Sequence, residues 1–137
     1  MNDIEKKMLA YAFDADKWKF KKCLEPYMQC NGSIIRAHTV QNSKVLDLLV
    51  RDGHVVSFKH WYEKDRGPII DYGLVGRKEA TTFTGLCDEH DNEVFRPIDT
   101  NDINAENQQH LFLLAYRAVL RELHATMEGH QRFKVVI

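Results

Sequence analysis

The sequence predicts an α+β fold in which a small antiparallel hairpin is flanked by an N-terminal helix and a long C-terminal helix. Three observations support this expectation. Apolar residues recur at helical spacing near both ends of the chain, β-branched and aromatic residues alternate in its middle, and a pair of cysteine or histidine residues stands on each side of that middle segment. With 137 residues, 44% of them hydrophobic, the chain fits a single domain, residues 1–137, with a core of its own.

The charge balance and the cysteine count narrow the class of protein. Nineteen basic against 20 acidic residues predict no strong attraction to nucleic acid or to an anionic membrane unless the charges are unevenly placed. No secretory signal follows Met1, and the longest apolar run, Leu111 to Leu120, is short and contains Arg117, so we expect a cytoplasmic protein without a membrane partner. Three cysteines are too few for a disulfide framework and favour metal binding or catalysis.

The first predicted helix runs from Asp3 to about Lys19. Its apolar residues follow a three- and four-residue spacing: Ile4, Met8, Leu9, Ala12 and Phe13. We expect this helix to pack on the domain without carrying chemistry.

A turn-rich segment with a short strand follows. Pro26 and Asn31–Gly32 mark turns on both sides of Cys30, and Ile34–Ile35 begins the strand. The next stretch predicts a short helix from Ser43 to Arg51, with Asn42 or Ser43 as its N-cap.

The middle of the chain predicts two antiparallel strands. Residues 53–62, GHVVSFKHWY, and 69–76, IIDYGLVG, are rich in β-branched and aromatic residues, and the polar residues 63–68 between them predict a turn.

Two helices are predicted after this hairpin. Acidic residues crowd the first turn of a helix from Cys87 to Phe95, and a polar linker then leads to a long helix from Gln109 to Met127, ended by Gly129. The apolar face of the long helix is expected to contain Leu111, Leu114, Ala115, Ala118, Val119 and Leu123. Tyr116, Arg117 and Arg121 are expected to pair with acidic neighbours or to pack along the zinc module. Residues 132–137, RFKVVI, form a last strand or lead into further sequence.

The cysteines and one histidine form two local pairs. Cys23 and Cys30 flank a proline-containing turn, while Cys87 and His90 stand at i and i+3, on one face of a helical turn. Tetrahedral zinc takes thiolate and imidazole donors at about 2.0–2.3 Å, so the four residues predict a structural zinc site. A first pair, a hairpin and a second pair from the start of a helix are typical of a treble-clef zinc finger, although the gap between Cys23 and Cys30 is wider than usual.

An interpretation without metal remains open for the same residues. In it, Cys23 is a small buried side chain, Cys30 a turn residue and His90 a solvent-facing helix residue.

Two stretches carry a resemblance to a known family. CNGSIIRAH, residues 30–38, and GLCDEHD, residues 85–91, resemble the HNH endonucleases, whose ββα-metal core often sits on a zinc-bound treble clef. The resemblance implies that His38 is the general base against a phosphodiester, with Mg²⁺ or Mn²⁺ as catalytic ion and nucleic acid as substrate. A neutral imidazole with a pKa of about 6.5 can accept that proton.

The chain departs from the HNH pattern at three places. Ala37 stands where the family places a metal ligand before the base. The middle asparagine and the final histidine are also missing, and the residues near those places are Thr81, Thr82 and Thr84 for the first, and Asp91, Asn92 and Phe95 for the second. The matching positions alone do not assemble the family's catalytic metal site.

The chain is also similar to a group of bacterial proteins of unassigned activity. The likeness covers residues 22–99 and includes IIRAHTVQ and TFTGLCDEHDNEVFRPID. It implies a shared polar set of His38, Gln41, His54 and Asp91. His38 then has three open roles: general base, zinc ligand in place of Cys23, or a hydrogen-bonding neighbour of the zinc site.

Two functions follow as hypotheses. The first is metal-dependent hydrolysis of phosphodiesters with His38 as base, and the second is a non-catalytic zinc module that binds nucleic acid or a protein partner. A complete set of catalytic-metal ligands would favour the first.

Overall fold

The computed structural model of the chain describes residues 2–14, 18–27, 29–41, 45–63 and 65–134. Helices and strands follow in the order α1 (Asp3–Phe13), β1 (Ala37–His38), α2 (Asp47–Leu49), β2 (His54–Glu63), β3 (Gly67–Gly76), β4 (Thr82–Phe83), α3 (Asp88–Thr100) and α4 (Gln108–Phe133). The strands form two antiparallel ribbons, β1 with β4 and β2 with β3. The predicted mixture of helices and antiparallel strands is confirmed.

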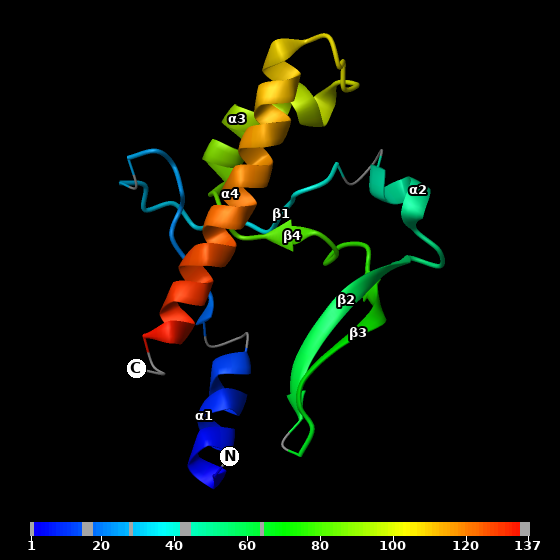
Figure 1. Cartoon of the computed structure of the whole chain (residues 1–137). Helices are drawn as coiled ribbons and strands as arrows, with labels where there is room; N and C mark the ends of the chain where they lie inside the picture. The colour runs from blue at the N-terminus through cyan, green and yellow to red at the C-terminus, as the bar shows by residue number, and fades with distance from the viewer. Residues whose placement is uncertain (1, 15–17, 28, 42–44, 64, 135–137) are drawn as a thin grey trace.

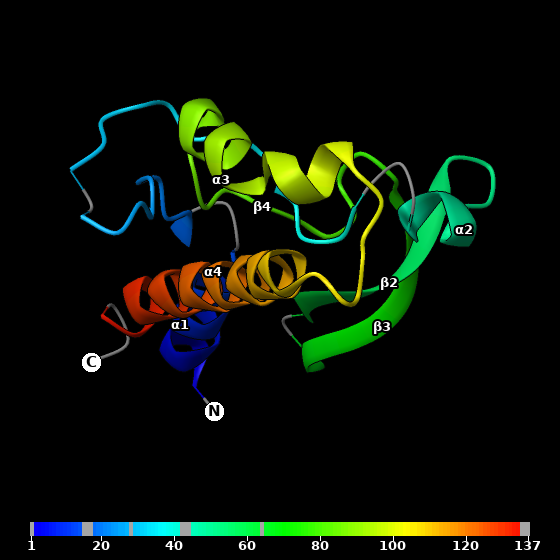
Figure 2. The ribbon, with the colours of Figure 1, turned by 90° about the horizontal axis from the view of Figure 1, so that it is seen from above.

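The long helix α4 packs against α3 and passes the short β1–β4 ribbon, as both ribbon views show (Figures 1 and 2). The β2–β3 ribbon stands to one side of α4 in both views. The core joins the loop before β1, the β4–α3 segment and both long helices, and its buried residues are Phe20, Cys23, Leu24, Phe83, Leu86, Cys87, Phe95, Ile98, Leu113 and Leu120.

Helix α1 begins where predicted and ends earlier. Asn2 and Glu5 form a capping box that satisfies backbone donors at its start. The helix ends at Phe13, because Asp14 is extended, and residues 15–17 of the range predicted to reach Lys19 lie outside the described residues. After them, Trp18 is 8% exposed, and its indole donates to the Tyr11 carbonyl at 3.1 Å.

The predicted strand from Ile34 is present only in part. The ladder of β1 contains Ala37 and His38, while Ile34 makes an isolated bridge with Cys87. The predicted helix from Ser43 to Arg51 is reduced to α2, and its expected caps, Asn42 and Ser43, lie outside the described residues.

The β2–β3 ribbon confirms the predicted hairpin. His54 pairs with Gly76 at one end and Glu63 with Gly67 at the other. Gly67 has a φ of 84°, which a glycine adopts without strain at the turn.

The β1–β4 ribbon was not predicted. Its register places Ala37 opposite Phe83 and His38 opposite Thr82. In the sequence, the whole β2–β3 ribbon thus lies between β1 and β4, two short strands that pair with each other.

Helix α3 is longer than predicted, because it continues through Pro97 to Thr100. Phe95 and Ile98 are 0% and 1% exposed, so burial of this face offsets the hydrogen bond that Pro97 cannot donate. The Asn101 side chain donates to the Pro97 carbonyl at 3.0 Å and helps to end the helix.

Helix α4 is also longer than predicted. It runs through Gly129 to Phe133, so Arg132 is helical and the expected last strand does not begin there. Residues 135–137 lie outside the described part of the chain.

The predicted apolar face of α4 is wrong. Leu111, Val119 and Leu123 are 47%, 61% and 43% exposed. The buried face instead carries polar residues among leucines, and its members are His110, Leu113, Arg117, Leu120 and His124. These residues follow the same helical period with a different phase. Each of the three polar side chains on this face has a hydrogen-bond partner, which is the Asn104 N–H for His110, Asp99 for Arg117 and Thr84 for His124.

Candidate metal centre and the adjoining pocket

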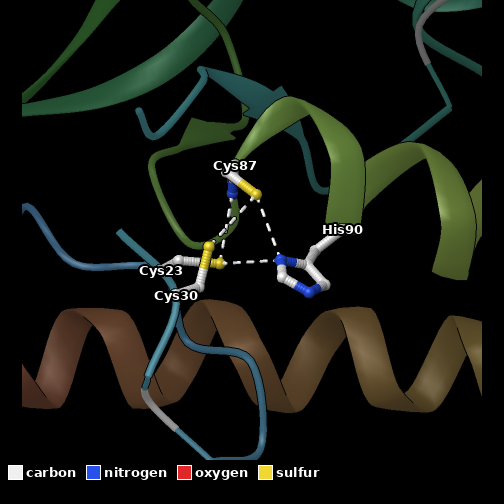
Figure 3. Close-up of side chains that lie close together, drawn as sticks. All are labelled: Cys23, Cys30, Cys87 and His90. Carbon is white, nitrogen blue, oxygen red and sulfur yellow. Dashed lines mark hydrogen bonds between the residues drawn. The ribbon is translucent and has the colours of Figure 1, made fainter. Parts of the chain in front are cut away.

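The two predicted ligand pairs meet in space. Cys23 and Cys30 lie in the loop before β1, Cys87 is the N-cap of α3, and His90 lies in the first turn of that helix. Their side chains converge on one point beside α4 (Figure 3). One donor atom from each residue lies within 4.8 Å of the other three, and the group can hold a metal ion.

The separations fit a tetrahedral site. The sulfurs of Cys30 and Cys87 are 3.7 Å apart, and Nδ1 of His90 is 3.6 Å from the Cys23 sulfur and 3.1 Å from the Cys87 sulfur. With bonds of about 2.3 Å, the edge of a tetrahedron is about 3.7 Å. Among the residues that the structure describes, this is the one group of three or more cysteine, histidine or acidic residues so arranged, and it is compatible with structural zinc.

Backbone donors surround the sulfurs. The Cys87 N–H donates to the Cys23 sulfur at 3.3 Å, and the Gly32 N–H donates to the Cys30 sulfur at 3.2 Å. A Cβ on Gly32 would lie 3.0 Å from the Cβ of Cys87, so any larger residue there would press on the cluster. Such donors stabilise the negative charge of thiolate ligands.

Glu25 organises the loop between the first two cysteines, and the sequence analysis missed it. Its buried carboxylate accepts the backbone N–H groups of Tyr27, Gln29 and Cys30. These bonds, the first of them above all, lower the pKa of Glu25. A glutamate directly before Pro26 was the available signal, because a carboxylate at the start of a turn can bind the N–H groups that follow.

Hydrogen bonds within the cluster favour the thiolate form of Cys87, at the start of α3. The backbone N–H of His90 lowers the pKa of Cys87 to about 7, and hydrogen bonding to Cys87 raises the pKa of His90. Burial raises the pKa of the Cys23 thiol. A cation bound here would offset the cost of ionising the buried sulfurs.

His38 lies outside the cysteine cluster, so the arrangement in which it replaces Cys23 as a ligand is not the one in this structure. Its Nδ1 is 3.0 Å from the carbonyl oxygen of Ala80. Since a carbonyl only accepts, Nδ1 carries the proton, and Nε2 of the neutral ring is left as an acceptor.

The turn that supplies the Ala80 carbonyl is strained. Thr81 has a φ of 60°, which is uncommon for a β-branched residue. The Thr39 N–H holds it by donating to the Thr81 carbonyl at 2.8 Å, and the Thr39 hydroxyl donates to the same oxygen. This conformation fixes the carbonyl that orients His38.

A pocket of about 330 Å³ contains His38 and three members of α3 and α4 in its wall: Asp91, Asp99 and Arg117. Gln41 also lines it and donates to the Ile98 carbonyl at 2.8 Å. His38, Gln41 and Asp91, three of the four residues expected to form a shared polar set, therefore lie in one pocket.

The fourth member of that set lies elsewhere. His54 is exposed at the start of β2, where its Nδ1 donates to the Asp52 carbonyl at 2.8 Å. It does not line the pocket.

Arg117 is the buried cation of the pocket. Its side chain is 4% exposed, donates twice to Asp99 at 2.8 and 2.6 Å, and lies 4.1 Å from the centre of the Phe95 ring. Its Nε has no hydrogen-bond partner among the described residues. The expected pairing of Arg117 and Arg121 with acidic residues is confirmed, with Glu122 as the partner of Arg121.

Asp91 brings a partly desolvated carboxyl group to the same pocket. Burial raises its pKa, and the nearby charge of Arg117 opposes that rise. A carboxyl group kept there at the expense of stability is typical of functional sites.

Comparison of the chain with protein-family models, with curated proteins and with solved structures gives no match. Within the described residues, no helix is both long and apolar enough to cross a membrane.

Proposed function

We propose that this chain is a zinc-stabilised domain that hydrolyses phosphodiester bonds, with His38 as the general base. The observation that carries the proposal is the pocket whose wall contains His38, Asp91 and Arg117, where Asp91 directly follows His90 of the cysteine cluster. The predicted zinc site and the predicted base are thus neighbouring features with separate roles.

Zinc is the metal that the cluster suits best. Three thiol sulfurs and one imidazole nitrogen form a closed set of four donors, which is the composition of structural zinc sites. The zinc would join the loop of Cys23 and Cys30 to the start of α3.

The order of elements around the cluster supports a treble-clef assignment with a ββα-metal arrangement. The first ligand pair precedes β1, β1 pairs with β4, and the second pair opens α3. His38 ends β1, the place that the HNH resemblance gives to the base.

His38 is prepared for proton transfer by its hydrogen bond. Because Nδ1 donates to Ala80, Nε2 can take a proton from water as that water attacks phosphorus. The backbone holds the ring in this tautomer before substrate arrives.

Asp91 is the residue that we assign to a divalent cation, Mg²⁺ or Mn²⁺. Mg²⁺ is commonly held by one or two carboxylates, with water and substrate phosphate completing its shell, so a full protein cage is not needed. When bound, the cation would supply positive charge to the phosphate and its leaving oxygen.

Arg117 supports an anionic substrate in the same pocket. Its guanidinium lines the pocket and is held there by two bonds to Asp99. A cationic group in the pocket wall attracts a phosphate.

The test is cleavage of supercoiled plasmid DNA and of RNA with Mg²⁺ or Mn²⁺, using wild type, His38→Ala and His54→Ala. The histidines are matched, because Nδ1 of each donates to a backbone carbonyl, while only His38 lines the pocket. We expect His38→Ala to reduce the rate by about 100-fold or more and His54→Ala to cleave like wild type.

Two results would overturn the proposal. One is wild-type protein that carries zinc but cleaves neither substrate with either ion, which would leave the non-catalytic module as the function. The other is an equal loss of activity in both histidine variants.

A further inference from the structure

One face of the β2–β3 ribbon is apolar and exposed. Val56 and Phe58 on β2 are 68% and 66% exposed, and Ile70, Tyr72 and Leu74 on β3 are 72%, 68% and 63% exposed. Large apolar side chains exposed together in this way mark interaction surfaces in soluble proteins.

The strand register places these residues on the same face. Val56 pairs with Leu74, and Phe58 pairs with Tyr72. Residues two apart along a strand point to the same side, so His60 and its partner Ile70 extend the same surface. We call these six residues the ribbon face.

The ribbon face is built as one surface, and the rest of the fold leaves it open. The Phe58 and Tyr72 rings lie 4.6 Å apart across the strands. On the opposite face Val55 is 7% exposed, so at that end the ribbon packs with its other side against the domain. A two-stranded ribbon alone is marginally stable in water, and covering the ribbon face would stabilise it.

The size of the ribbon face suits association between proteins. Its two aromatic and three aliphatic side chains expose on the order of 500 Å² of apolar surface, taking about two-thirds of the area of each. A stable interface needs about 800 Å² from each partner, and His60 with the neighbouring backbone and Pro68, which is exposed, extends the area toward that size.

The chemistry of the ribbon face suits a copy of itself. It contains no acidic residue, lysine or arginine, so a second copy brings no charge repulsion and a charged partner finds no complement. A two-fold axis through the Phe58–Tyr72 pair would place Val56 and Leu74 of one copy on His60 and Ile70 of the other. The patch is therefore complementary to itself under the commonest symmetry of soluble oligomers.

We propose that two copies of the chain associate face to face through the ribbon face, forming a two-fold symmetric dimer. The proposal does not depend on zinc binding or on cleavage, because none of the six residues belongs to the cluster or lines the pocket.

The test is the molar mass of the purified chain by sedimentation equilibrium, over concentrations of roughly 1–100 µM. Wild type should approach twice 16.0 kDa. Phe58→Asp should raise the dissociation constant by about 100-fold or more, because it places a carboxylate in an apolar interface next to its symmetry mate.

Phe112→Asp is the matched control. Phe112 on α4 is 65% exposed, nearly the same as Phe58, but lies outside the ribbon face. The Phe112→Asp variant should therefore remain a dimer. Ile70→Lys serves as a second ribbon variant, and zinc content with the melting curve verifies that each variant is folded.

Three results would overturn the proposal: a wild type that stays monomeric at the highest concentration, a dimer unaffected by Phe58→Asp and Ile70→Lys, or a dimer that Phe112→Asp dissociates. The last result would assign the contact to α4.

Discussion

Replacing Cys87 with serine should unfold the domain under conditions in which wild type is stable. The sulfur of Cys87 lies 3.7 Å from that of Cys30 and 3.1 Å from Nδ1 of His90, and the residue is 3% exposed. A serine hydroxyl stays protonated at neutral pH and is a poor zinc ligand, so the substitution removes one donor of four.

The expected loss of stability can be judged against the other contacts that join the loop of Cys23 and Cys30 to the segment before α3. The Leu24 N–H donates to the Gly85 carbonyl at 2.8 Å, and the Ile35 N–H donates to the Leu86 carbonyl at 3.0 Å. Each such bond contributes about 1 kcal/mol net. Structural zinc contributes on the order of 10 kcal/mol, which is comparable to the whole stability of a domain of this size. The backbone bonds cannot replace it.

Leu86→Ala is the matched control at the neighbouring position. Leu86 is 2% exposed, and its truncation should cost about 2–5 kcal/mol through the cavity it leaves. At about 4 °C per kcal/mol, the melting temperature should fall by roughly 10–20 °C while one zinc per chain is retained. Cys87→Ser should instead lose both the zinc and the cooperative melting transition.

The assay combines thermal melting by circular dichroism with zinc analysis of protein purified without added metal. Wild type treated with a strong chelator should behave like Cys87→Ser. A Cys87→Ser protein that melts within a few degrees of wild type, or a wild type that the chelator leaves unchanged, would refute the reasoning.

Two further substitutions test the pocket and the loop. Asp91→Asn should abolish cleavage and, without added divalent ion, raise the melting temperature at neutral pH. Burial raises the pKa of Asp91, so its ionised form costs stability above its unfolded pKa, and a lower melting temperature would contradict this. Gly32→Ala should weaken zinc binding by roughly tenfold or more, because the added Cβ would lie 3.2 Å from the sulfurs of Cys30 and Cys87. Gly129→Ala, with no atom within 4 Å of the added Cβ, should keep its zinc and be stabilised by about 0.5–1 kcal/mol, and equal zinc loss in both variants would contradict the steric argument.

The grouping of the four candidate metal ligands could be predicted because each pair is local. The i, i+3 spacing of Cys87 and His90 places both on one helical turn, and the turn signals around Cys30 place it near Cys23. The part played by Glu25 could not be predicted with the same ease, because its contacts depend on the conformation of the turn.

The buried face of α4 could not be predicted from apolar periodicity. That pattern treats Arg117 and His124 as exposed, whereas both are buried. Each is compensated by a partner far away in the sequence: Asp99 binds Arg117, and the Thr84 hydroxyl lies 3.0 Å from Nε2 of His124. Such pairs become visible only once the chain is folded.

The β1–β4 ribbon was missed for a related reason. Each strand has only two residues. His38 pairs with Thr82, and the 43 residues between them in the sequence include the whole β2–β3 ribbon. Short runs of this kind carry no detectable alternation. This pairing nevertheless places His38 beside the turn that orients it.

The central claim is that zinc supports the fold while His38 acts on the substrate. The measurement that tests it most directly is zinc content and cleavage rate determined together on His38→Ala. We expect one zinc per chain, an unchanged melting temperature and a cleavage rate lowered by about 100-fold or more. A His38→Ala protein that has lost its zinc, or one that cleaves as fast as wild type, would contradict the claim.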